Sequence, residues 1–327
     1  MAFTLSNTRL LKLGYRPDFG AIVSVVAVLS AFTVVDPGGL WSFFTVKNVT
    51  QYTAIIGFLA LGQTFVIMTG EIDLSVGSVY GLTAIAFIIF ANSIGVTLGF
   101  LAAMGVAAFV GALNAFLVVR LRLVSMIATM STLFLFRGVI YLWTGGTADS
   151  LSKANRTDGL AALLGGNWFS LENGFFLFVL ASVLLQVFLS ASRTGNHMVA
   201  VGGDAVSAHS RGVKVGRTKS KAYLLSAVLA GLSGIMTVCD QPQTHVTLGE
   251  SMELESIAAA VLGGAALSGG RGSAIGPCLG ALVLTTVRYE LIVLGAPSSW
   301  YITFVGLVLI VAVIANQKIA TAVRRLA

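Results

Sequence analysis

The stretch 74–119 constrains the fold of this chain more than any other, because it contains no charged side chain. A helix crosses a bilayer with about 20 mostly apolar residues, so this stretch is too long for one span and long enough for two. The polar break at Asn92 and Ser93, followed by Gly95, divides it. The sequence therefore predicts two transmembrane helices here.

Composition extends this prediction to the whole chain. Of the 327 residues, 56% are hydrophobic and 10% are charged, whereas a soluble domain carries about 25% charged residues. We expect an all-α, polytopic transmembrane domain over residues 1–327. Its helices, about ten in number, are expected at 20–38, 50–69, 76–92, 96–119, 124–143, 173–192, 222–240, 252–268, 273–293 and 298–316. The segment 252–268 is rich in Gly and Ala, and a re-entrant helix is the alternative there.

The basic residues predict the orientation, because Lys and Arg stay on the cytoplasmic side of a membrane. They concentrate in the loop 193–221, which lies between the charge-free runs 173–192 and 222–239. With this loop inside, both termini are also cytoplasmic and carry Arg9, Lys12, Arg16, Lys318, Arg324 and Arg325. Since these residues lie at span ends and not on one face, we expect membrane lipid and no nucleic acid as a partner.

The sequence GEIDLSVGS, residues 70–78, joins two apolar runs and contains the rare acids Glu71 and Asp73. Ser75 is placed to cap the following helix, and Asp73 to accept hydrogen bonds from exposed N–H groups at the helix end. We therefore expect Glu71, Asp73, Ser75 and Gly77 to have a structural role. A direct role in a solute pathway or in a partner contact is the alternative.

Arg137 lies inside a predicted span, where an ionised side chain is costly unless it faces water, the bundle interior or a carbonyl partner. It either lines a solute path or braces the bundle, and we treat it as a pathway candidate. The polar residues Gln51, Gln63 and Asn114 also lie in spans, and hydrogen bonds between helices are sufficient to explain them.

No motif in the chain indicates catalysis, a cofactor or a metal. The glycine-rich GGRG at 269–272 lacks the G-x-x-x-x-G-K-[ST] pattern of an ATP-binding loop. The three histidines lack metal-ligand spacing, and Cys239 and Cys278 lie in apolar runs. We therefore expect a protein that is not an enzyme, with any ATP hydrolysis in a separate partner.

A faint internal repeat relates residues 54–85 to residues 256–284. Each copy predicts an apolar helix, a glycine-rich polar break and a helix of small residues. The predicted topology places both breaks on the cytoplasmic side. A two-fold repeat of this kind favours two bundles around a central pathway.

Three segments carry a family likeness: TGEIDLSVGS at 69–78, TGNHMVAVGGDAVSAHSRGV at 194–213, and ELESIAAAVLGGAALSGGRGSAIGPCLGAL at 253–282. Together they resemble the membrane permease subunit of bacterial ABC importers of the ribose/xylose/arabinose type. The likeness covers about residues 15–317. It implies a multi-pass protein of the bacterial inner membrane that imports a monosaccharide or related polyol.

The resemblance also implies partners. These are a cytoplasmic ABC ATPase, an extracytoplasmic solute-binding protein, and a second permease that is either an identical copy or a sister. Residues 193–221 would be the cytoplasmic coupling loop that docks into the ATPase. Its coupling residues would be Gly202, Gly203, Asp204, Ala205, Ala208, Arg211 and Gly212. Gly202 and Gly203 would allow a tight turn, and Asp204 would cap a short coupling helix.

Two other functions are possible for such a chain. ABC permeases for branched-chain amino acids are distantly similar, although GEIDLSVGS is closer to sugar permeases. An ion-coupled secondary transporter would need an intramembrane carboxylate. The acids in the predicted spans, such as Asp36, Asp240 and Glu290, lie near span ends, which disfavours this alternative.

Overall fold

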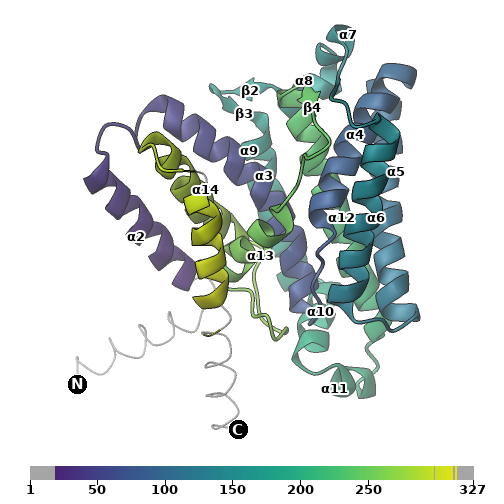
Figure 1. Cartoon of the computed structure of the whole chain (residues 1–327). Helices are drawn as coiled ribbons and strands as arrows, with labels where there is room; N and C mark the ends of the chain where they lie inside the picture. Colours follow the sequence, from purple (N-terminus) through teal and green to yellow (C-terminus); the bar gives the residue numbers. More distant parts are fainter. Residues whose placement is uncertain (1–18, 298, 312–313, 315–327) are drawn as a thin grey trace, which may run out of the picture.

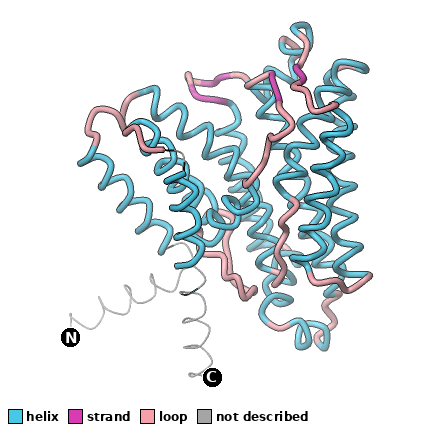
Figure 2. The backbone as a smooth tube through the Cα atoms, in the orientation of Figure 1, coloured by secondary structure: helices cyan, strands magenta, loops and turns pink. Residues whose placement is uncertain are grey.

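The computed structural model describes residues 19–297, 299–311 and 314, and helices dominate it (Figures 1 and 2). The helices of the first part are α2 Phe19–Val35, α3 Phe43–Met68, α4 Val76–Ile94, α5 Val96–Ala115 with its π-helical extension Phe116–Arg120, and α6 Ser125–Thr144. Those of the second part are α7 Lys153–Arg156, α8 Gly159–Gly165, α9 Asn173–Ala191, α10 Arg193–Gly203, α11 Ala205–Ser210, α12 Val215–Asp240, α13 Met252–Leu262 and α14 Gly276–Val293. A further apolar helix covers Ser299–Val311.

The strands are short and lie at one end of the helical body (Figure 2). Strand β1 (Asp149–Ser150) pairs antiparallel with β4 (Gln243–Thr244), and β2 (Asn167–Trp168) with β3 (Leu171–Glu172). With α7 and α8 they occupy the end of the molecule opposite to α10 and α11 (Figure 1).

The predicted all-α membrane fold is confirmed. Within the described residues, seven helices are long and apolar enough to cross a membrane: α3, α4, α5 with its extension, α6, α9, α12 and α14. The helices α2 and Ser299–Val311 match two more predicted spans but are shorter. The basic residues predicted near both termini lie outside the described residues.

The predicted span at 252–268 is wrong, and the re-entrant alternative describes it better. Helix α13 has 11 residues, which is about 16 Å of helix against a hydrocarbon core of about 30 Å. It ends at Gly263 and Gly264, where Gly264 has a φ of 92°. Neither glycine is polar, so a hydropathy profile of the sequence shows no break where the helix ends.

Helix α12 lies at the centre and packs against α3, α4 and α5. Small residues allow these close contacts. A side chain at Gly231 would meet Ala107 of α5, and one at Gly234 would meet the carbonyl oxygen of Tyr80 of α4. The core of α3, α4 and α12 is therefore built on close backbone contacts.

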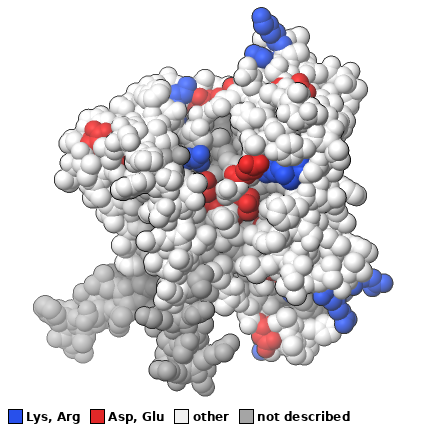
Figure 3. Space-filling view, viewed as in Figure 1, with Lys and Arg blue, Asp and Glu red and all other residues white. Residues whose placement is uncertain are grey.

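A second layer consists of α13, α14 and Ser299–Val311, which cover the other side of α3, and of α2, which packs on α14. Gly276 and Gly280 of α14 leave room for the backbone of Gly263 and Ala259. Gly276 and Gly280 are four residues apart, so they lie on the same face of α14. Figure 3 shows a hollow in the face between this layer and the α4–α6 group, and acidic and basic side chains gather there.

Candidate coupling segment and charged hollow

The segment 193–221 forms the short helices α10 and α11 at the end of the molecule and the first turns of α12 (Figure 1). Ser192 caps α10 by accepting a hydrogen bond from the backbone N–H of Gly195 at 3.0 Å. Met198 and Val201 are buried, while most polar residues of α10 face outward. The amphipathic pattern thus holds α10 along the ends of the long helices.

Asp204 begins α11, as the sequence predicted. Its Oδ1 accepts hydrogen bonds from the backbone N–H groups of Val206 and Ser207, at 2.9 and 3.3 Å. The far end of α11 is closed by Gly212, which has a φ of 85°. Gly212 N–H donates to the carbonyl oxygen of His209, and Val213 N–H to that of Ala208. This is the Schellman arrangement, which favours glycine at that position.

Gly202 and Gly203 do not make the tight turn predicted for them. They are the last residues of α10, and neither has a positive φ. A Cβ at Gly202 would overlap the carbonyl oxygen of Met68 and the N–H of Gly270. Gly202 therefore serves close packing, while a Cβ at Gly203 would meet nothing.

The contact at Gly202 joins three segments that are far apart in the sequence. Gly270 N–H donates a 3.0 Å hydrogen bond to the carbonyl oxygen of Met68, the last residue of α3. The glycine-rich break 263–275 therefore meets the last residue of α3, directly before the other break at 69–75, and the end of α10. We call this contact of Met68, Gly202 and Gly270 the break junction.

The outer surface of α11 is open. Val206 is 77% exposed, and Arg211 and Gly212 are exposed beside it. Ala208 is buried and anchors the helix, while Ala205 is half-buried. Next to α11, a groove of about 720 Å³ is lined by the charged or titratable residues Glu71, Arg122, His209, Lys214, Arg217 and Lys219.

Asp73 is fully buried between α3 and α4. Its Oδ1 accepts hydrogen bonds from the N–H and Oγ of Ser75, at 2.9 and 2.6 Å. Ser75 makes no capping hydrogen bond, contrary to expectation. Ser75 Oγ instead accepts from Asn114 Nδ2 at 2.7 Å, and Thr132 donates to Asn114 Oδ1 at 2.7 Å. This chain connects the motif to α5 and α6.

Glu71 and Gly77 connect the same motif to other elements. Glu71 forms an ion pair with Lys219 of α12. A side chain at Gly77 would meet the carbonyl oxygen of Gly249 and the carboxylate of Glu253, so α4 lies directly against the start of α13. The contacts of Glu71 and Gly77 are those of residues that hold neighbouring helices together.

Arg137 reaches from α6 to the loop between α12 and α13. Its Nη1 donates to the carbonyl oxygens of Val246 and Leu248, at 3.1 and 2.8 Å. Of the three expected environments, the carbonyl partner is therefore present. Glu250 and Glu253 lie close enough to interact with its charge.

The other wall of the hollow holds Arg288 of α14. Its Nη1 lies 3.4 Å from Glu255 Oε2 of α13. The guanidinium carbon is 5.5 Å from the ring centre of Tyr52 and 5.1 Å from that of Tyr301. Sequence reasoning assigned Arg288 no role. It missed this cluster because α13 was counted as a full span, which placed Glu253 and Glu255 at a membrane surface.

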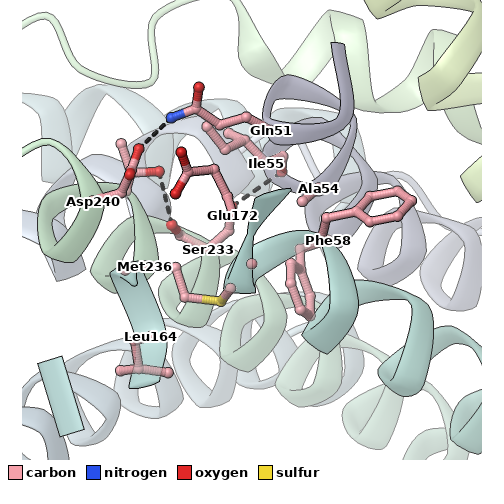
Figure 4. Close-up of a pocket in the computed structure, with 13 residues that line it drawn as sticks. Gln51, Ala54, Ile55, Phe58, Leu164, Glu172, Ser233, Met236 and Asp240 are labelled. Carbon is pink, nitrogen blue, oxygen red and sulfur yellow. Dashed lines mark hydrogen bonds between the residues drawn. The ribbon is translucent and has the colours of Figure 1, made fainter. Parts of the chain in front are cut away.

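A separate small pocket lies between α3, α8, α9 and α12 (Figure 4). Gln51 donates to Asp240 there, and Lys47 pairs with Glu172 at 3.0 Å. The space of about 30 Å³ holds a water molecule or two and is too small for a sugar. Within residues 19–297 and 299–311, no three His, Cys, Asp or Glu residues are placed to hold a metal ion.

Comparison with known proteins identifies relatives along most of the chain. The chain is 33% identical to the autoinducer 2 import system permease protein of Enterobacter sp. (strain 638), over 94% of this chain and 89% of that protein. It is 33% identical to the ribose import permease protein of Bacillus subtilis (strain 168), over 94% and 93%. It is 32% identical to the fructose import permease protein of Rhizobium meliloti, over 91% and 85%.

No solved structure matches the chain significantly. Residues 45–313 match a family model described as branched-chain amino acid transport system / permease component. This range includes the break junction, both short helices of the coupling segment and the charged hollow. The chain belongs to this family of ABC importer permeases, and is a multi-pass membrane transport subunit and not an enzyme.

Proposed function

We propose that the chain is the membrane-spanning permease of an ABC importer for a monosaccharide or related polyol. The relatives named above import ribose, fructose and autoinducer 2 by name, and they support a sugar over a branched-chain amino acid. The observation that carries the transport mechanism is the break junction, where the proposed coupling segment contacts the break 263–275 and the end of α3 that precedes the break 69–75.

The coupling segment 193–221 receives the ATPase at α11. Val206 and Arg211 are exposed there for contact, and Asp204 and Gly212 fix the two ends of the helix. When the ATPase moves α11, α10 moves with it, because Asp204 directly joins the two helices. At Gly202 there is no side chain to absorb the displacement, so α3 and the loop 263–275 follow.

The cytoplasmic side is then the end that carries α10 and α11, and the N- and C-termini lie on that side. The basic groove beside α11 contacts the ATPase or the anionic lipid of the cytoplasmic leaflet. An extracytoplasmic solute-binding protein docks at the opposite end, near α7, α8 and the strands. A second permease, identical or a sister, completes the pathway.

The variant Gly203→Arg tests the coupling segment. A side chain at Gly203 has free space in the chain itself, so the permease should reach the membrane in normal amounts while the ATPase no longer co-purifies. Gly159→Arg, at an equally open position at the opposite end, is the control. Normal co-purification of the ATPase with Gly203→Arg would refute the assignment.

The substrate class is tested by uptake. The permease is reconstituted in proteoliposomes with its ATPase and binding protein, and uptake of radiolabelled D-ribose, D-fructose and L-leucine is compared. ATP-dependent sugar uptake is expected, with no uptake driven by an ion gradient alone. Leucine uptake without sugar uptake would support the amino-acid alternative instead, and gradient-driven uptake without ATP would support an ion-coupled transporter.

A further inference from the structure

The charged hollow lies about half-way between the two ends of the molecule, where α13 begins (Figures 1 and 3). Glu250 and Ser251 are exposed, and Glu253 and Arg137 are half-buried. Ionised groups at mid-membrane depth face water, a protein partner or a solute path, and not hydrocarbon. Since these groups open onto one face of the permease, that face is part of the aqueous path or is covered by a partner.

Arg288 has the geometry of a contact group in this hollow. The rings of Tyr52 and Tyr301 lie within cation–π distance and limit its movement. Glu255 is buried and neutralises its charge. A guanidinium has five N–H donors in a fixed plane, and the pairing with Glu255 uses Nη1. The side chain remains 35% exposed.

The start of α13 adds polar groups at the same depth. Ser251 precedes it with a φ of 66° and makes no side-chain cap. Glu253 Oε2 is a buried atom without a hydrogen-bond partner among the described residues. Broken helices that begin at mid-membrane depth form the solute sites of many transporters.

This set of groups suits a neutral solute with several hydroxyl groups. The paired Arg288 and Glu255 carry no net charge together, so they offer donors and acceptors without requiring a charged ligand. Tyr52 beside them is half-buried and adds part of an aromatic ring to the same place, while Tyr301 is buried behind it and holds Arg288. A free amino acid would instead need an uncompensated cation for its carboxylate.

We propose that Arg288, held between Tyr52 and Tyr301 and paired with Glu255, contacts the sugar or polyol as it passes through the permease. This proposal rests on the proposed function. Through the contact of Arg288 with the solute, the permease contributes to solute selectivity in addition to the binding protein.

The test uses the full complex in proteoliposomes with the sugar that the wild type takes up best. Arg288→Gln should lower ATP-dependent uptake about tenfold or more, the loss expected for hydrogen bonds to a charged group. Assembly with the ATPase and basal ATP hydrolysis should not change. Ser131→Ala, at an exposed position of α6 where the hydroxyl donates to Ile127 of the same helix, is the control and should transport normally.

A charge exchange separates solute contact from a structural ion pair. In the double variant Arg288→Glu with Glu255→Arg, a purely structural pair would be restored and uptake would return to the wild-type rate, which would overturn the proposal. Uptake that stays low supports it. Unchanged uptake by Arg288→Gln alone would also overturn it.

A second measurement serves if the Arg288 variants do not assemble. A cysteine placed at Leu254, an exposed residue of α13, should react with a charged, membrane-impermeant thiol reagent, and the transported sugar should slow that reaction. Absence of protection would refute the solute contact. A wild type that takes up none of the sugars would refute the proposed function itself, and not this assignment alone.

Discussion

Two exposed regions of this permease have opposite compositions. On the outer side of α6 and α9, large apolar side chains are exposed, among them Phe134 at 67%, Leu142 at 86% and Leu184 at 60%. Helix α9 has no charged residue, and the one charge of α6, Arg137, reaches toward the loop before α13. In the hollow, exposed and half-buried groups include Glu250, Glu253, Arg137 and Arg288.

Exposure alone therefore does not identify the function of a surface in a membrane protein. The apolar face suits hydrocarbon, where every charge is costly. The hollow would be unstable in the same environment. We infer that the two regions contact different solvents, lipid for α6 and α9, and water, solute or a second permease for the hollow.

The largest expected effect comes from placing the same charge in both regions. Phe134→Asp should destabilise the inserted protein by about 2.5–3.5 kcal/mol, the cost of Asp at the centre of a membrane helix. Leu254→Asp, on α13, should be tolerated. The amount of monodisperse protein after detergent extraction measures both. Equal losses for the two variants would mean that the hollow also faces lipid.

A smaller but clear effect is expected from Arg137→Leu. Two carbonyl oxygens, those of Val246 and Leu248, would lose the one charged Nη1 donor that they share, at a total cost of about 1.5–3 kcal/mol. The loop that forms one wall of the hollow should loosen, and Tm should fall. Arg137→Lys is the matched control and should recover part of the loss. An unchanged Tm would contradict the bracing role.

Glycine positions sharpen the same comparison. Gly77 of α4 touches the start of α13, so Gly77→Ala should cost about 1–3 kcal/mol through overpacking. Gly138 of α6 has open space around it, and Gly138→Ala should be neutral or stabilising by up to about 1 kcal/mol. Thermal unfolding of the two variants in the same detergent gives the difference. A stable Gly77→Ala would show that this wall of the hollow can move.

The smallest effect concerns the coupling segment, which is exposed to water. The hydrogen bond from Ser207 lowers the pKa of Asp204. The folded pKa lies below the unfolded value of about 3.9. The stabilisation that the Asp204 cap contributes is therefore complete above the unfolded pKa, and it is lost as pH falls through the folded pKa. Hydrogen exchange at α11 should be constant from neutral pH to about pH 5 after correction for intrinsic rates. In the variant Asp204→Asn, hydrogen exchange at α11 should no longer change at lower pH. If it still changes, a group other than Asp204 is responsible.

Sequence reasoning recovered the long helices because each is an apolar run of sufficient length. It also identified the cap at Asp204, which depends on neighbours within three residues. It failed at 252–268, where Gly263 and Gly264 end the helix without adding polarity, and at Gly202, whose contacts with Met68 and Gly270 cross long sequence separations. The ion pair of Arg288 was missed for the same reason, since its partner Glu255 lies on another helix.

The sequence by itself determined that this chain is a helical membrane protein, since the transfer of apolar side chains into lipid depends on each segment alone. It also determined the family, through motifs that are local in the sequence. Only the tertiary structure decided that the glycine-rich break at Gly270 meets the end of α3 at Met68, and that a half-length helix brings carboxylates to mid-depth beside Arg288. These features depend on which backbones approach closely enough to touch, and that is a property of packing between distant segments.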